Sequence, residues 1–162
     1  MNRILGIIFT VVAIAVMVFA ILNWGNYKSL CFKGGDDLET IDENSRCEIA
    51  FFGGSFTGID PSLMTELLEI AHEYVGLGKV SGIRCSTRPD YIDEDILLQL
   101  KKYGVKVIEL GLQSADERVL SLTKRGHDFS AEKRACKLIK DSGFSLVGQM
   151  MIGLPGANEM SE

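Results

Sequence analysis

Four short segments of the chain combine glycine with hydroxyl, amide or guanidinium groups, and each one comes directly after an apolar run. They read GGSFTG (53–58), STRPD (86–90), GLQS (111–114) and GLPG (153–156). Paired glycines let a ligand approach the backbone closely. Hydroxyl and amide groups bind sugar hydroxyls, and an arginine pairs with a carboxylate or a phosphate. If the four segments meet in space, these groups predict a polar binding site.

Each segment taken alone also fits a purely structural role. The glycine pair suits a tight turn, the STRPD segment suits the entry to a helix, and Gln113 precedes a residue that could cap a helix. Arg125, in the TKRGH segment, suits a solvated helix end, and His127 beside it is a further candidate for the site. We prefer the functional interpretation because all four segments fall at the same kind of position, the end of a predicted strand.

The elements that must position these groups alternate between strands and helices. Apolar runs predict strands at 48–52, 80–85, 105–110 and 144–152. Helices are expected to begin at Asp60, Asp93, Ser114 and Ser130, each of which is a good capping residue. This β-α-β-α-β-α-α-β order predicts an α/β fold with parallel strands, either a doubly wound sheet or part of a (β/α) barrel. In both architectures the ligand binds at the carboxyl ends of the strands.

The N-terminal part of the chain has a different composition. Residues 4–22 carry no charge, and these 19 residues would span about 28 Å as a helix, close to the hydrocarbon thickness of a bilayer. We therefore predict a membrane anchor over 1–24, a linker over 25–46 and an α/β domain over 47–162. A recombined or wrongly assigned N-terminus is the alternative. Arg3 lies on one side of the apolar run, and Lys28 and Lys33 lie on the other, so the charges do not decide the orientation.

Charge and cysteine content exclude other classes of protein. The chain has 22 acidic and 17 basic side chains and a net charge of −5, which argues against a dedicated nucleic-acid groove. Its four cysteines, Cys31, Cys47, Cys85 and Cys136, lack the close spacing of a zinc ribbon or a redox CxxC pair. No metal-ligating residue is predicted, and Cys85 and Cys136 are expected to be small buried side chains.

The motifs together resemble those of a known family. EIAFFGGSFTGI, IRCSTRPDYI, VIELGLQSADERVL followed by KRGH, and GFSLVGQMMIGLPG resemble the radical S-adenosylmethionine (SAM) superfamily, in order and in spacing. The likeness is to the branch of the Elongator catalytic subunits and the oxygen-independent coproporphyrinogen oxidases, and it runs from about Leu38 to Glu162. It implies a partial, TIM-barrel-like (β/α)6 barrel. In that family SAM binds at the strand ends beside a [4Fe–4S] cluster, which reduces it to a 5′-deoxyadenosyl radical.

The resemblance also implies roles for individual residues. Gly53 and Gly54 match the motif whose backbone receives the SAM amino group, and Arg125 matches an arginine that pairs with the SAM carboxylate. Gln113 matches a ribose-binding position, and Ser86 falls where some relatives contact the ribose. The full predicted cofactor-binding set is Gly53, Gly54, Ser55, Thr57, Ser86, Arg88, Gln113, Arg125, Ile152 and Gly153.

One departure from the family is large, since the CxxxCxxC motif that holds the iron–sulfur cluster is absent. Catalytic residues therefore remain unassigned. The chain is either a radical SAM enzyme or its remnant, or a non-catalytic, membrane-tethered domain without a cluster. A phosphate-binding α/β enzyme with its site at the glycine pair is a third, less favoured hypothesis. A cluster needs a reducing interior, so we expect a single-pass membrane protein with residues 23–162 in the cytoplasm.

The number of predicted strands leads to an expectation about partners. Four strands cannot close a barrel, and the two edges of such a sheet lack neighbours. We therefore expect a curved half-barrel that is marginally stable or that a partner chain completes. The substrate is not predictable from these residues.

Overall fold

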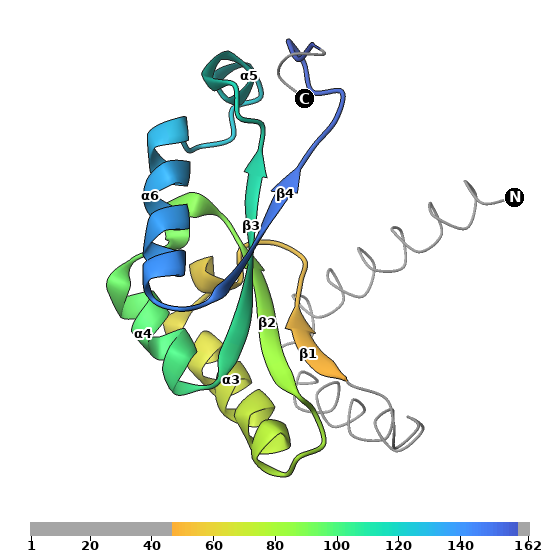
Figure 1. The fold of residues 1–162 in the computed structure, drawn as a ribbon, viewed down its shortest axis with the longest axis vertical. Coiled ribbons are helices and arrows are strands. Elements are labelled where there is room, and N and C mark those ends of the chain that lie inside the picture. The colour runs from red at the N-terminus through yellow and green to blue at the C-terminus, as the bar shows by residue number, and fades with distance from the viewer. Residues whose placement is uncertain (1–46, 159–162) are drawn as a thin grey trace, which may run out of the picture. The chain divides into compact units, whose positions relative to one another are not determined.

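Four parallel strands form a single sheet within residues 47–158, the part of the chain that the computed structural model describes (Figure 1). The strands are β1 (Glu48–Phe51), β2 (Gly82–Thr87), β3 (Val105–Gln113) and β4 (Ser145–Met150), and they lie in the order β1-β2-β3-β4. All three neighbouring pairs are parallel. The predicted parallel α/β fold is therefore confirmed, and the four carboxyl ends lie at one edge of the sheet.

The helices connect the strands on one side of the sheet. The α-helices are α3 (Pro61–Gly76), α4 (Glu94–Lys102), α5 (Glu117–Leu122) and α6 (Phe129–Asp141). Two 3₁₀ turns, η2 (Phe56–Gly58) and η3 (Pro89–Tyr91), follow β1 and β2. Figure 1 shows α3, α4 and α6 on the same face of the sheet, as crossovers of one hand require. No described helix covers the other face, which we call the open face.

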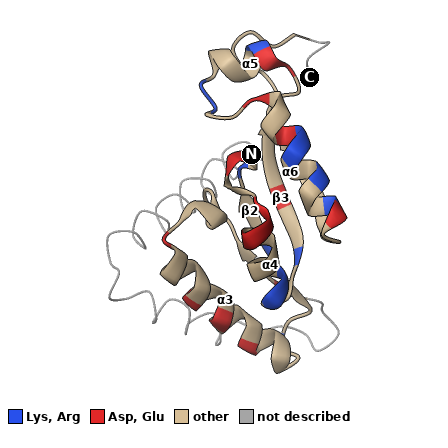
Figure 2. Ribbon diagram, turned by 90° about the vertical axis from the view of Figure 1, so that its left-hand side faces the viewer, with Lys and Arg blue, Asp and Glu red and all other residues tan. Residues whose placement is uncertain are grey.

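The helix-covered face forms the apolar core. Every second residue of β2 and β3 points into it, and Ile83, Cys85, Ile108 and Leu110 are fully buried there. These side chains pack against an apolar stripe from each covering helix, which consists of Met64, Leu67, Leu68, Ala71, Leu97, Leu100, Ala135 and Ile139. Polar residues cover the outside of these helices, and the ribbon in Figure 2 shows several basic residues along α6 and acidic residues along α3.

Two of the four predicted helix starts are confirmed. The Asp60 carboxylate accepts hydrogen bonds from the backbone N–H groups of Ser62 and Leu63, at 3.0 and 3.1 Å, and Pro61 occupies the first helical position. The Asp93 carboxylate accepts from Ile96 N–H at 2.8 Å. An extended residue with a carboxylate satisfies the donors that the first turn of a helix leaves unpaired.

The other two starts were wrong. Asp116 caps α5 in place of Ser114, and Asp128 caps α6 in place of Ser130. The Ser114 hydroxyl already accepts from the Asp116 N–H, and the Ser130 hydroxyl donates to the Asp128 carboxylate. In both cases a nearby aspartate, which is acceptor-only and has two oxygens, displaces the serine as the cap.

The ends of the four strands differ from the predicted ends by one to three residues. β2 continues to Thr87 and β3 continues to Gln113, so Ser86 and Gln113 lie inside strands and not in the loops after them. β4 ends at Met150, two residues before Ile152. Pairing with the neighbouring strand extends β2 and β3 beyond their predicted ends: Ser86 lies opposite Glu109, and Gln113 lies opposite Met150.

The predicted membrane segment 4–22 and the linker 25–46 lie outside the described residues. Over 47–158, no helix has both the length and the apolar character needed to cross a bilayer. The anchor, its orientation and the partner chain at the sheet edge stay predictions.

Candidate functional site

The turn after β1 exposes its backbone. Gly53 and Gly54 have φ values of 98° and 138°, which side-chain-bearing residues rarely adopt. Both glycines are exposed, and a Cβ placed on Gly54 would meet no atom within 4 Å. The glycine pair is therefore needed for the backbone conformation, and it also leaves the peptide groups accessible to a ligand.

Thr57 connects the β1 turn to the end of β2. Its hydroxyl lies 2.5 Å from the Thr87 hydroxyl and donates to the Tyr91 carbonyl at 2.7 Å. Both threonines are buried. The Thr57 hydroxyl therefore holds η2 against η3, a role that sequence reasoning did not foresee. Ser55, which precedes η2, is half-buried.

Arg88 is paired within its own loop. Its Nε and Nη2 atoms donate to the two carboxylate oxygens of Asp90 at 2.9 and 2.7 Å, and its guanidinium lies 5.3 Å from the centre of the Tyr91 ring. On the other side it lies against the backbone of Gly126, where a Cβ would come within 2.6 Å of Arg88 Nη2. Arg88 thus joins the loop after β2 to the turn that carries Arg125.

Gln113 and Arg125 come together through Met151. The Arg125 Nη2 donates to the Met151 sulfur at 2.8 Å, and the Met151 N–H donates to the Gln113 carbonyl at 2.9 Å. Gln113 has a φ of 70°, unusual for a residue with a side chain, and its amide folds back over Gly111, where a Cβ would lie 2.7 Å from Gln113 Nε2. The structure therefore brings two of the predicted site residues into one contact group.

The guanidinium of Arg125 lacks a strong partner. A thioether is only a weak hydrogen-bond acceptor. The Arg125 Nε is buried without a hydrogen-bond partner, and no ion pair formed by the described residues includes Arg125. A half-buried cation of this kind suits an incoming carboxylate.

Two further predicted site residues, Ile152 and Gly153, follow the end of β4. Ile152 exposes 85% of its accessible surface, and Gly153 adopts a positive φ of 78° just after it. No recorded contact within 47–158 joins Gly54 to the group around Arg125, although Thr57, Tyr91, Arg88 and Gly126 form a continuous line of contacts between them.

Sequence reasoning missed a polar network on the open face, to which Ser86 belongs. The Ser86 hydroxyl donates to Gln149 Oε1 at 3.4 Å, and Gln149 Nε2 donates to Glu109 at 2.8 Å. Arg84 pairs with Glu109 at 3.4 Å and with Glu48 at 3.2 Å. The signal was present in the sequence, since each apolar strand carries polar residues at alternate positions.

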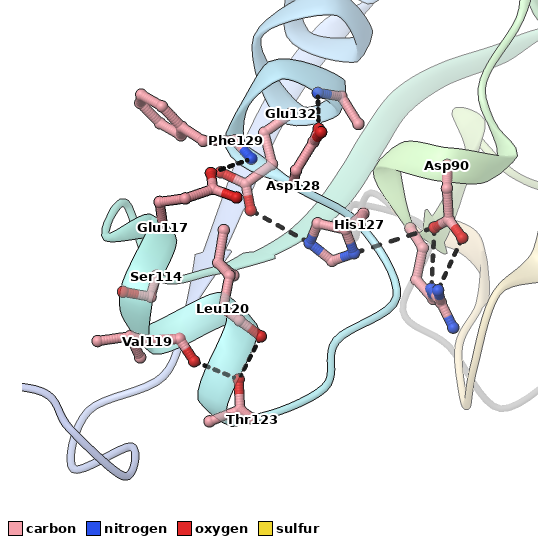
Figure 3. Close-up of polar contacts among 12 residues, drawn as sticks. Asp90, Ser114, Glu117, Val119, Leu120, Thr123, His127, Asp128, Phe129 and Glu132 are labelled. Carbon is pink, nitrogen blue, oxygen red and sulfur yellow. Dashed lines mark hydrogen bonds and ion pairs between the residues drawn. The ribbon is translucent and has the colours of Figure 1, made fainter.

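The side chain of His127, which the sequence offers as a candidate, is buried among partners that were not predicted (Figure 3). Its side chain is 1% exposed, with Nε2 3.1 Å from the Glu132 carboxylate and Nδ1 4.0 Å from the Asp90 carboxylate. Burial, together with the nearby charges of Glu117 and Asp128, raises the pKa of Glu132 to about 7. The turn 124–128 and the start of α6 line a hollow of about 490 Å³ beside this cluster.

The described cysteines do not form a metal site. Burial raises the pKa of the Cys85 thiol to about 12, with a further contribution from Glu109, and burial also raises the pKa of Cys136. Over 47–158, no three His, Cys, Asp or Glu side chains are grouped closely enough to hold a metal ion. A [4Fe–4S] cluster, which needs three closely spaced thiolates, does not fit these residues.

Comparisons with known proteins identify the family of the chain. The family model of the radical SAM superfamily matches residues 36–161. The tRNA uridine(34) acetyltransferase of Methanocaldococcus infernus is 42% identical over 72 residues, which is 44% of this chain and 14% of that protein. The chain therefore spans about a seventh of the length of this relative.

Two solved structures share the fold. The Methanocaldococcus infernus Elp3 structure, with residues 1–46 deleted, superposes with a TM-score of 0.69 at 26% identity and covers 85% of this chain and 36% of its own. Coproporphyrinogen III oxidase (HemN) from Escherichia coli gives a TM-score of 0.60 at 21% identity over 70% of this chain and 26% of its own.

Four parallel strands with helices on one face define an α/β domain that is consistent with a partial (β/α) barrel. The chain belongs to the radical SAM superfamily. Its sequence is similar to part of the Elongator complex protein 3 of Homo sapiens, with 43% identity over 79 residues, which is 49% of this chain and 14% of that protein.

Proposed function

We propose that the domain binds SAM at the carboxyl edge of its sheet. The observation that carries this proposal is the half-buried Arg125 guanidinium, which has a thioether as its only described hydrogen-bond partner and lies next to Gln113. A ligand carboxylate would supply the two charge-assisted hydrogen bonds that this guanidinium lacks. Membership of the superfamily supports SAM over other ligands with a carboxylate.

The other groups at this edge suit the remaining parts of the same ligand. Backbone carbonyls at Gly53 and Gly54 are acceptors for an ammonium group, and the Gln113 amide both donates and accepts, as ribose hydroxyls require. Met151 and Ile152 offer exposed apolar surface, of which 45% and 85% respectively is accessible, for a flat base. Each part of SAM therefore has a matching group among the described residues.

In the superfamily, a [4Fe–4S] cluster supplies the electron that cleaves SAM. Because the described residues do not fit such a cluster and the sequence lacks CxxxCxxC, we derive no reaction step for this chain. The proposal for this chain is SAM binding without its own cluster, and the radical SAM enzyme remains the alternative.

Calorimetric titration of the full chain with SAM tests the proposal. Arg125→Ala removes a charge-assisted pair and should weaken binding by about ten- to a hundredfold. Gln113→Ala should weaken it less, by about fivefold, because neutral hydrogen bonds contribute less. The control is Lys79→Ala, which removes an exposed cation before β2, at the opposite edge of the sheet. Unchanged affinity in both site variants, or no binding by the unmodified chain, would overturn the proposal.

A further inference from the structure

The turn that carries Arg125 needs an anchor. Residues 123–128 connect α5 to α6, and two of them, Lys124 and Gly126, adopt positive φ values of 51° and 81°. The first half of this turn is held by α5, since the N–H groups of Thr123, Lys124 and Arg125 donate to its carbonyls at 3.0, 3.2 and 3.3 Å. The second half, from Gly126 to Asp128, is fixed by side-chain contacts. The direction of the Arg125 side chain therefore depends on what fixes this turn from the sides.

His127 is the side chain that fixes the turn. It is almost fully buried and lies between two carboxylates from different elements, Glu132 on α6 and Asp90 on η3 (Figure 3). Asp90 in turn holds Arg88, which packs against Gly126 of the same turn. The imidazole is hydrogen-bonded to the helix after the turn through Nε2, while its buried Nδ1 faces Asp90 at 4.0 Å without a hydrogen bond.

The charges around this imidazole come from every element packed against it. Glu132 and the capping Asp128 belong to the start of α6, and Glu117 comes from α5, where it accepts from Phe129 N–H at 2.9 Å. Asp90 comes from η3 and is paired with Arg88. The cations Lys124, Arg125 and Arg134 line the neighbouring hollow. The groups that directly face His127 are both acidic.

Hydrogen-bond logic restricts where protons can lie in this cluster. When the Glu132 carboxyl is protonated, it donates to His127 Nε2, and the neutral imidazole carries its own hydrogen on Nδ1, towards Asp90. When that carboxyl loses its proton to water, Nε2 must donate to the carboxylate, and the neutral ring then presents a lone pair to Asp90. The contact with Asp90 becomes repulsive.

We propose that His127 is a positioning residue for the ligand carboxylate: clamped by Glu132 and Asp90, it holds the 123–128 turn so that Arg125 faces the strand ends, and loss of one proton from the Glu132–His127 pair loosens that hold. This inference depends on the proposed SAM site. The burial that raises the Glu132 pKa to about 7 puts the change near neutral pH, so that the hold is firm below that pH and weakens above it.

SAM titrations of the full chain between pH 6 and pH 8.5 test this inference, with Glu132→Gln as the decisive variant. A glutamine amide donates to His127 Nε2 at every pH and so imitates the protonated carboxyl. We expect its affinity to equal that of the unmodified chain at about pH 6 and to exceed it by about fivefold or more at pH 8.5. The ratio of the two affinities at each pH cancels the effect of ligand ionisation, because both proteins are titrated with the same ligand.

His127→Ala should weaken binding by about tenfold, and the affinity should then no longer depend on the residue at 132. The matched control is His72→Ala, since His72 bonds the Tyr103 carbonyl at 3.0 Å, at the opposite end of the sheet, and should leave affinity unchanged.

Amide hydrogen exchange of residues 123–129 measures the stability of the turn without ligand. After division by the intrinsic exchange rate, which is base-catalysed, the protection of these amides should fall at high pH in the unmodified chain but not in the Glu132→Gln variant.

The outcomes separate the two proposals. If the chain binds SAM but Glu132→Gln keeps the same pH dependence, or His127→Ala behaves like His72→Ala, the role of His127 is overturned and the proposed function stands. If the unmodified chain binds no SAM at any pH, the proposed function is overturned, and so is the positioning role of His127, which depends on it.

Discussion

At the scale of single residues, two glycines with positive φ serve different needs that sequence alone does not separate. Gly126 and Gly143 have nearly the same backbone, with φ values of 81° and 84°. A Cβ on Gly143 would meet nothing within 4 Å, whereas a Cβ on Gly126 would meet Arg88 Nη2 at 2.6 Å. Gly143 is required by conformation only, and Gly126 also by a close approach.

This pair gives a matched prediction. Gly143→Ala and Gly126→Ala should each lower the free energy of unfolding by about 1–2 kcal/mol, the cost of an alanine in the left-handed region. Gly126→Ala should in addition push the guanidinium of Arg88 away from Asp90. Urea unfolding of each variant, alone and combined with Arg88→Ala, measures this difference.

In that double-mutant cycle, Gly126→Ala and Arg88→Ala should be non-additive by about 0.5 kcal/mol or more, while Gly143→Ala and Arg88→Ala should be additive. Since Arg88 is partly exposed, its pair with Asp90 contributes little, and a larger coupling is not expected. Additivity in both cycles would show that the Gly126 turn does not depend on Arg88.

At the scale of elements, local patterns predicted most of the framework. Short apolar runs predicted all four strands, and Asp60 and Asp93 marked two helix starts, because both signals depend on neighbours in sequence. The strand ends were missed because they are decided by pairing, such as Gln113 opposite Met150. The Glu132–His127–Asp90 contacts were missed because they join three elements.

The same layered arrangement predicts the reactivity of the cysteines. Cys85 lies on the helix-covered face of β2 with no exposed surface, and burial raises its pKa to about 12. Cys47, just before β1, is half-buried. Because the thiolate is the reactive form, iodoacetamide at pH 8 should alkylate Cys47 at least about tenfold faster than Cys85.

Peptide mapping by mass spectrometry after timed labelling gives both rates in one sample. In urea the two cysteines should react at similar rates, which provides the control for intrinsic reactivity. Equal rates in the native protein would mean that the helices do not cover β2 as described.

At the scale of the whole molecule, the residues of the proposed SAM site are separate from those that a cluster would need. Arg125, Gln113 and the glycine pair lie at the carboxyl edge of strands that are present, whereas the thiolates that would hold a cluster belong to a motif that the chain lacks. The three described cysteines cannot replace it, since Cys85 faces the core and Cys136 lies on α6. We therefore expect this chain to bind SAM without cleaving it reductively.

Anaerobic reconstitution with iron and sulfide tests that separation. We expect the chain to take up far less than about four iron atoms per molecule and, with dithionite, to form no 5′-deoxyadenosine from SAM, because three closely spaced thiolates are needed to hold the cluster. Coproporphyrinogen III oxidase from Escherichia coli, treated in the same way, is the positive control. Stoichiometric iron together with SAM cleavage would contradict the expectation and would favour the radical SAM enzyme, whereas SAM binding without iron would establish a domain that keeps the cofactor site and has lost its electron source.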